Sequence, residues 1–194
     1  MFRLIRAGAA RTFNSRDTFI ALSLCLVFGI IGGAKSHSYI YSFYDIYMSF
    51  PYMNNPADSF WIKCCLWLEI VCISMNAGVE YSDGVIKNKI ISGHTKASVF
   101  LSEMVIAVIE AAACFALTAI PILIGGKEFF FTMPSDSLTA LMLELFLCFV
   151  VWGIFSAALT LLIGSRVGGV VLALAMAGAF MLIKDLKWYK KREE

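Results

Sequence analysis

Charged residues are scarce in this 194-residue chain: Asp, Glu, Lys and Arg make up 15% of it, against about 25% in a typical soluble domain. Apolar residues make up 60%, which is more than one soluble core of this size can hide from water. The sequence therefore predicts an all-α integral membrane protein whose solvent is largely lipid. The net charge of +2 gives no indication of a nucleic-acid partner.

The chain also lacks the spacings typical of metal and disulfide sites. It has no CxxC, and neither His37 nor His94 has a second candidate ligand nearby in the sequence. We expect no metal site and no disulfide framework. The six cysteines all lie in apolar runs, where a free thiol packs as a small apolar side chain: Cys25, Cys64, Cys65, Cys72, Cys114 and Cys148.

Catalytic motifs are missing as well. Gly125–Gly126–Lys127 is followed by Glu128 rather than Ser or Thr, and no earlier glycine completes a phosphate-binding loop. The sequence contains no GxSxG and no HExxH. We therefore expect no enzymatic activity and no cofactor in this chain.

The hydrophobic runs predict one transmembrane domain over residues 1–194. Residues 1–17 carry four arginines beside apolar residues at helical spacing, which is typical of an interfacial helix; a cleaved signal peptide is the alternative. Residues 35–58 are polar and aromatic and are predicted to form a loop. The predicted spans cover about 18–33, 59–77, 97–124, 138–162 and 167–183.

The distribution of basic residues orients these spans with the N-terminus in the cytoplasm. Only Lys35 and Lys127 then fall outside. The predicted cytoplasmic set is larger: Arg3, Arg6, Arg11, Arg16, Lys87, Lys89, Lys96 and Arg166. Five spans would leave the basic residues after Ile183 outside, so either the fifth segment does not cross fully or a sixth span is missing.

Residues 78–96 interrupt the spans with a polar stretch. Asp83 can cap a helix that starts at Gly84, and Gly93 can end it in a left-handed turn. Val85, Ile86, Ile90 and Ile91 lie at helical spacing, and Lys87, Asn88 and Lys89 point elsewhere. This predicts a short amphipathic helix at about 83–93, on the cytoplasmic side; a solvated loop with snorkelling lysines is the alternative.

The segment EYSDGVIKNKIISGHTK at 80–96, followed by VFLS at 99–102, resembles the membrane subunits of type-2 ABC transporters. In that family an acidic residue, a glycine, a basic-Asn run and a Gly before Ser/Thr-basic lie between the second and third spans. Glu103 stands where members often carry Lys, and members usually have six spans. The resemblance implies that this is a coupling helix, which docks on a separate ATPase through Asp83, Gly84, Ile86, Lys87, Asn88, Lys89, Gly93, His94 and Lys96.

The resemblance implies that the chain is an exporter subunit in the cell membrane. Its cargo would be amphipathic, such as a peptide, a lipid-like molecule or a drug. ATP and Mg²⁺ would be bound by the partner ATPase. A second membrane subunit, identical or different, would complete the transporter. Two other classes stay open: a membrane scaffold or immunity protein that transports nothing, and a proton-linked carrier.

Ionisable residues inside the predicted spans are candidates for function. Glu69 and Glu110 fall near the middle of neighbouring spans, where they either line a translocation path or lock helices together through hydrogen bonds. Lys63 and Glu144 lie at similar depth and are a candidate pair, whereas Glu103 is expected to reach the headgroups. Small residues allow close helix contacts or a seam between subunits: Gly29, Gly32, Gly33, Gly168, Gly169 and Gly178.

Overall fold

A computed structural model describes the backbone of residues 2–49, 60–125 and 135–193, and the side chains of 2–34, 64–125, 139–140 and 142–179. Within these residues the secondary structure is entirely helical, which confirms the predicted all-α class for this part of the chain. The seven helices are α1 (Phe2–Phe13), α2 (Arg16–Ser49), α3 (Phe60–Ser82), α4 (Val85–Ile91), α5 (Lys96–Gly125), α7 (Ser135–Ile163) and α8 (Arg166–Glu193).

In the described part of the chain, four helices contain segments that are long and apolar enough to cross a bilayer, so the chain is a multi-pass membrane protein. These segments are Arg16–Ala34, Cys64–Ser82, Lys96–Gly125 and Met142–Ile163. The predicted fifth span coincides with α8, but its apolar part among the described residues, Arg166–Ala179, is shorter than the others. Four of the five predicted spans are thereby supported by both length and hydropathy.

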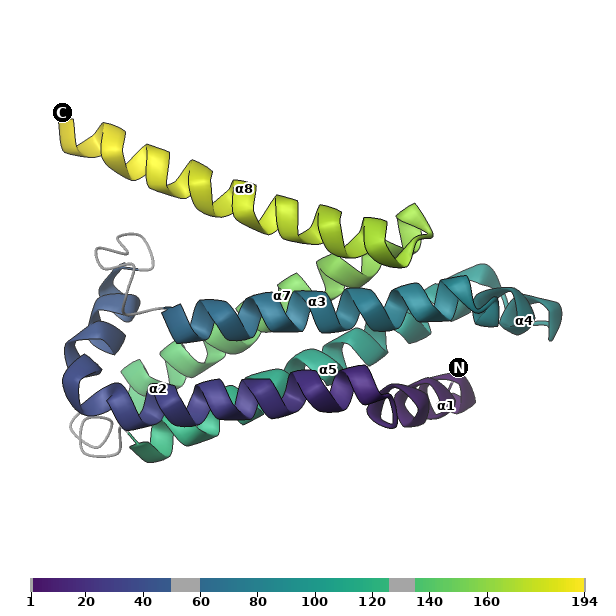
Figure 1. Ribbon diagram of the computed structural model, residues 1–194, viewed down its shortest axis with the longest axis horizontal. Coiled ribbons are helices and arrows are strands. Elements are labelled where there is room, and N and C mark those ends of the chain that lie inside the picture. The colour runs from purple at the N-terminus through teal and green to yellow at the C-terminus, as the bar shows by residue number, and fades with distance from the viewer. Residues whose placement is uncertain (1, 50–59, 126–134, 194) are drawn as a thin grey trace.

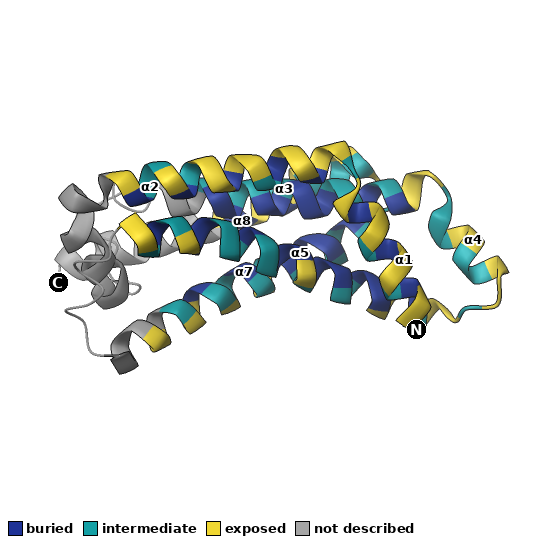
Figure 2. Ribbon diagram, turned by 90° about the horizontal axis from the view of Figure 1, so that it is seen from below, coloured by how far each residue is buried: buried dark blue, intermediate teal, exposed yellow. Residues whose placement is uncertain are grey.

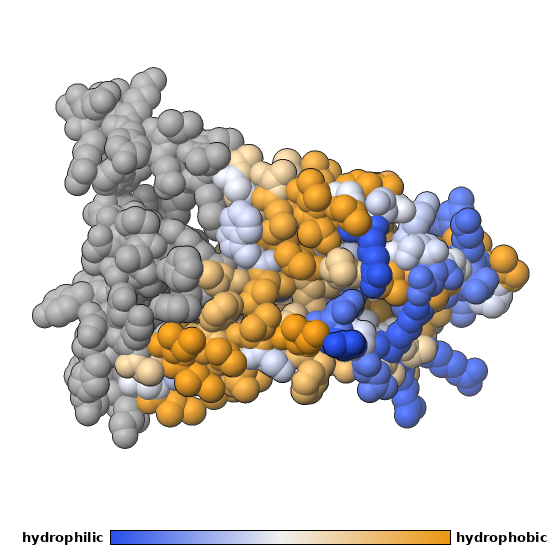
Figure 3. Space-filling view, in the orientation of Figure 1, coloured by the Kyte–Doolittle hydropathy of each residue, from blue (hydrophilic) through white to orange (hydrophobic). Residues whose placement is uncertain are grey.

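The long helices run roughly along one axis, and α8 diverges from the others toward its C-terminal end (Figure 1). At one end of this bundle lie α1, α4 and the turn between α7 and α8 (Figure 1). The surface at that end is hydrophilic, and an apolar band covers the middle of the molecule (Figure 3). Arg166 and the basic residues of the N-terminal segment and of α4 therefore gather at one end, as the prediction from charge distribution requires.

The main core cluster lies where α2, α3, α5 and α7 meet (Figure 2). Phe149 is fully buried there, and its ring meets that of Phe115 edge to face at 5.9 Å. Cys25, Cys65 and Cys114 are also buried in this cluster, as free thiols. Their role as small apolar fillers agrees with the prediction.

Helices α2 and α5 approach each other closely through glycine. A Cβ added at Gly29 would lie 2.8 Å from the Leu117 carbonyl oxygen, and one added at Gly33 would collide with the Pro121 carbonyl oxygen. Pro121 has no N–H to give to the Leu117 carbonyl, which therefore faces the Gly29 backbone without its usual helical donor. The predicted close contact is confirmed, but the partner of Gly29 and Gly33 is α5 of the same chain and not a second subunit.

The predicted loop at 35–58 needs correction over 35–49, and the rest of it lies outside the described residues; a helix forms at Phe2–Phe13, within the predicted 1–17. Residues 35–49 continue α2 as helix rather than forming a loop. No proline interrupts them, because the first proline after the span is Pro51, and helical conformation is disfavoured at the residue that precedes a proline. In α1 the buried residues are Leu4, Gly8 and Thr12, which pack toward α5. Phe2 and Phe13 stay exposed, which leaves an apolar face of this helix available to the membrane surface.

Candidate functional site

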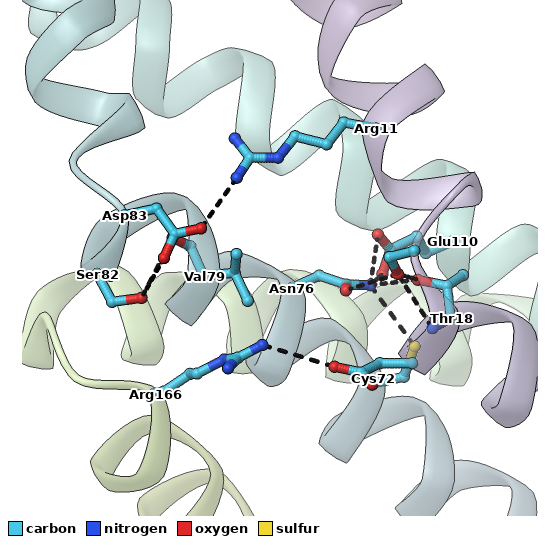
Figure 4. Close-up of polar contacts among 11 residues, drawn as sticks. Arg11, Thr18, Cys72, Asn76, Val79, Ser82, Asp83, Glu110 and Arg166 are labelled. Atoms are coloured by element: carbon cyan, nitrogen blue, oxygen red, sulfur yellow. Dashed lines mark hydrogen bonds and ion pairs between the residues drawn. The ribbon is translucent and has the colours of Figure 1, made fainter.

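The short helix α4 connects the ends of α3 and α5 through two glycines in left-handed conformation. Gly84 has φ 69° and Gly93 has φ 94°, so both need the conformational freedom of glycine. The prediction that Asp83 caps this helix is wrong: the N-cap is Gly84, and no side chain bonds the free N–H groups. The Asp83 carboxylate instead accepts hydrogen bonds from Arg11 Nη2 and Ser82 Oγ, both at 3.3 Å (Figure 4).

The two faces of α4 differ from the predicted ones. Val85, Ile86, Lys89 and Ile90 are half-buried, and they lie on the side of α4 that faces the bundle. The opposite side carries Lys87, Asn88 and Ile91, all exposed, with Ile91 82% exposed. The predicted apolar stripe is therefore wrong at two positions, because Ile91 points out and Lys89 points in. His94 is half-buried, while Gly93 and Lys96 are exposed at the same end of the bundle.

Lys89 is the centre of a network of charges. Its Nζ donates to Glu80 Oε2 of α3 at 2.8 Å and to Glu103 Oε1 of α5 at 2.7 Å. Glu80 also accepts from Arg11 Nη1 of α1 at 3.4 Å. Both carboxylates are buried. Four side chains of alternating charge thus connect four helices, and we call this set the Arg11–Glu80–Lys89–Glu103 network.

Electrostatics keep Lys89 charged. Burial lowers the pKa of its amine, but hydrogen bonds to Glu103 and Glu80 outweigh burial and raise the pKa above its usual value. Glu103 was expected to reach the headgroups, and that expectation is wrong because its carboxylate turns inward to Lys89. Glu103, which stands where membrane subunits of type-2 ABC transporters often carry Lys, is therefore paired with Lys89 in the structure.

A second polar cluster lies deeper, between α2, α3 and α5. Asn76 Nδ2 donates to both carboxylate oxygens of Glu110, at 3.2 and 3.3 Å, and lies 2.8 Å from Thr18 Oγ1 (Figure 4). Thr18 in turn shares a 2.7 Å hydrogen bond with Ser15. Glu110 therefore joins α5 to α3 through hydrogen bonds, and its role as a helix lock or as part of a translocation path stays a prediction.

A small cavity joins the two groups of polar residues. Its volume is about 10 Å³, which is close to the smallest that holds one water molecule. Asn76, Glu80, Glu103 and Glu110 are among the residues that line it, with Thr12 from α1. The charged network and the deeper cluster are thus neighbours along one polar seam inside the bundle.

Glu69 lies apart from these hydrogen bonds. It is fully buried, and neither carboxyl oxygen has a hydrogen-bond partner. A Cβ added at Gly153 of α7 would lie 3.1 Å from Glu69 Oε1, so the carboxyl faces that helix. Glu69 and Glu110 therefore share no hydrogen bond in the described structure, and the two roles considered for Glu69 stay predictions.

The other proposed intramembrane pair stays a prediction. Glu144 is exposed on α7. Lys63 belongs to α3, but its side chain lies outside the described residues.

Glu80, Asn76 and Arg11 were not predicted as site residues, although Arg11 belongs to the predicted cytoplasmic set and Glu80 begins the segment that carries the resemblance. Their signal was present: Glu69, Asn76 and Glu80 recur at intervals of seven and four on α3, and Glu103 and Glu110 at an interval of seven on α5. Such intervals place side chains on one face of a helix. Two facing spans with polar residues at this spacing indicate a buried polar seam.

The chemistry of the site is that of joining helices. Among the described side chains no three His, Cys, Asp or Glu residues are grouped so as to hold a metal ion. No protein-family model matches the chain, and comparison with curated proteins and with solved structures found no match.

Proposed function

We propose that this chain is the membrane-spanning subunit of an ATP-driven exporter, and that α4 docks on a separate ABC-type ATPase. The observation that carries the proposal is the two-sided character of α4. Its inner side is bound to α3 and α5 through Lys89, and its outer side presents Lys87, Asn88 and Ile91 at the end of the bundle. The resemblance of residues 80–102 to the coupling segment of type-2 ABC transporters supports this role.

The exposed side of α4 has the features of a docking helix. Ile91 supplies an apolar side chain that can enter a hydrophobic groove on the partner. Lys87 lies on the same side and can meet acidic residues at the rim of such a groove, which speeds association more than it strengthens binding. The left-handed glycines at both ends present α4 as a protruding turn of helix.

Transport would follow from movement of α4. ATP and Mg²⁺ bind the partner ATPases, whose closure displaces the docked helix, and α3 and α5 follow because they are joined to it. With α1 and α4 in the cytoplasm, two membrane subunits alternate access to a path for an amphipathic cargo. The exporter direction, the class of cargo and the cell-membrane location rest on the resemblance.

Affinity purification from the native membrane tests this function. We expect an ATPase in stoichiometric amount with the wild-type chain, and at least about tenfold less of it with Lys87→Glu, since charge reversal replaces attraction by repulsion at the rim. Arg6→Glu is the matched control, because it makes the same charge change on an exposed residue of α1. A wild-type chain that purifies alone, or with a partner that does not bind ATP, contradicts the proposal.

A proton-linked carrier is the second candidate, and it is favoured by one observation. Glu69 is a fully buried carboxyl without a hydrogen-bond partner, and ionisable groups inside membranes are frequently part of proton pathways. In a carrier, Glu69→Gln abolishes function and Lys87→Glu does not. In an ATPase-driven exporter, Lys87→Glu abolishes function.

A further inference from the structure

The two lysines of α4 have different surroundings although only one residue separates them. Lys87 is exposed on the outer side of the helix. The Lys89 side chain is 13% exposed, and its amine bridges Glu80 at the end of α3 and Glu103 in the second turn of α5. A lysine with all its charge directed into the bundle cannot also serve as a contact for a partner.

From this difference we infer that Lys89 is a positioning residue: it ties α4 to α3 and α5, so that a displacement of α4 moves both helices together. This inference rests on the proposed function for the source of the displacement, but the tie itself is a property of the chain alone. The docking contact then belongs to Lys87 and Ile91, and the transmission of movement belongs to Lys89.

Among the described residues, the other hydrogen bonds of α4 are local to it. Asn88, Ser92 and Gly93 donate and accept only backbone bonds within α4 and its turn, apart from a local Ser92 Oγ bond to the Lys89 carbonyl. None of the residues of α4 is buried. Besides the peptide links at its two ends and the packing of its half-buried apolar residues, two short ion pairs to buried carboxylates are therefore the strongest polar connection described between α4 and the spans.

Arg11 extends the same connection to α1. Its guanidinium bonds Glu80 at 3.4 Å and Asp83 at 3.3 Å, on either side of the α3 terminus. Its side chain is 42% exposed, so these bonds are screened by water and weaker than those of Lys89. Movement of α4 consequently reaches α3 and α5 first and the interfacial helix more weakly.

The first experiment measures amide hydrogen exchange in residues 85–91 of the purified chain in lipid nanodiscs, without any ATPase. Lys89→Met should raise exchange there at least about tenfold, because it leaves buried Glu103 without its ion-pair partner and Glu80 with only the weaker bond from Arg11, and so frees α4 to open locally. Lys87→Met, which removes the same charge two residues away, should leave exchange unchanged. The double variant Lys89→Glu with Glu103→Lys should restore protection, since Lys at 103 can meet both acidic neighbours.

The second experiment adds the co-purified ATPase. Genetically encoded spin labels at Ala97 in α5 and Val167 in α8, both exposed, report the distance between the helix ends with ATP and vanadate and without nucleotide. We expect Lys89→Met to keep the ATPase bound but to lose at least about half of the nucleotide-induced shift, and the charge-swapped variant to regain it.

The outcomes separate the two ideas. Unchanged exchange in Lys89→Met, or an unchanged nucleotide-induced shift, overturns the positioning role while a co-purified ATPase still supports the proposed function. If Lys89→Met raises exchange and the charge-swapped variant restores protection, the tie is supported even where no ATPase is found. In that case only the proposed function fails.

Discussion

Replacing Gly29 by alanine tests the closest contact between α2 and α5. An added Cβ would stand 2.8 Å from the Leu117 carbonyl oxygen, 3.0 Å from that of Thr118 and 3.2 Å from the Thr118 Cα. All three are backbone atoms, so no side chain can rotate away and the helices themselves must separate. Overpacking of this kind costs about 1–3 kcal/mol.

The matched control is Gly178→Ala in α8. The nearest atom to a Cβ at Gly178 is a ring carbon of Trp67 at 3.8 Å, which is an ordinary contact. Alanine improves helix propensity by about 1 kcal/mol at either position, so this contribution cancels when the two variants are compared. The difference between them isolates the cost of the added methyl group against α5.

Thermal unfolding of both variants in detergent or nanodiscs, followed by tryptophan fluorescence, measures this difference. About 2–4 °C per kcal/mol is expected for a chain of this size, so Gly29→Ala should melt about 2–12 °C below Gly178→Ala. Equal melting temperatures, or a more stable Gly29→Ala, would refute the close approach of α2 to the carbonyl that Pro121 leaves without a donor.

Two further predictions concern the polar seam. Lys89 has a raised pKa, so its contribution to holding α4 is complete below the unfolded-state value of about 10.4 and is lost only as pH rises through the higher folded-state value; a spin label at Ser92 should keep the same mobility from pH 6 to 9 and become mobile only at a pH above that unfolded-state value. Asn76→Leu removes the Asn76 donor from the buried Glu110 and should destabilise the protein by about 1–3 kcal/mol, whereas Glu110→Gln, which keeps an acceptor for Asn76, should cost less in the same thermal assay; equal losses would contradict the pairing.

Much of the architecture follows from the apolar runs of the sequence. The third predicted span, 97–124, corresponds to α5 (Lys96–Gly125) almost residue for residue, because a long apolar run between a glycine-containing turn and a glycine pair has clear limits. The short helix between α3 and α5 was expected because two glycines bound a stretch whose apolar residues recur at helical spacing. The helical course of residues 35–49 was not, since tyrosines and serines between two spans have no strong preference that distinguishes a helix from a loop.

The faces of the helices were harder to predict than their limits. In α4 one helical turn separates Val85 from Lys89, and hydrophobicity alone placed Ile91 in the same apolar stripe as Val85 and placed Lys89 off that stripe. The structure reverses both, because Glu80 and Glu103 provide two buried negative charges that stabilise the amine. The inward position of Lys89 depends on side chains from three helices, so the sequence pattern of one helix cannot predict it.

The buried glutamates show a similar limit. The depth of Glu69 and Glu110 in their spans was predictable from residue counts, but the partner of Glu110 is Asn76, whose position on the same face as Glu80 becomes informative only when α3 and α5 are placed together. Rotation of a helix about its axis decides such contacts. Length and hydropathy do not fix that rotation where the whole span is apolar.

The central claim, that the outer side of α4 binds an ATPase, is tested most directly by a photo-crosslinking amino acid at Ile91, which is 82% exposed. The same amino acid at Leu24, exposed on the apolar surface of α2, is the control. We predict that irradiation of native membranes joins position 91, and not position 24, to a protein that binds and hydrolyses ATP. Crosslinks from position 91 to lipid alone, or to a protein without ATPase activity, would contradict the account.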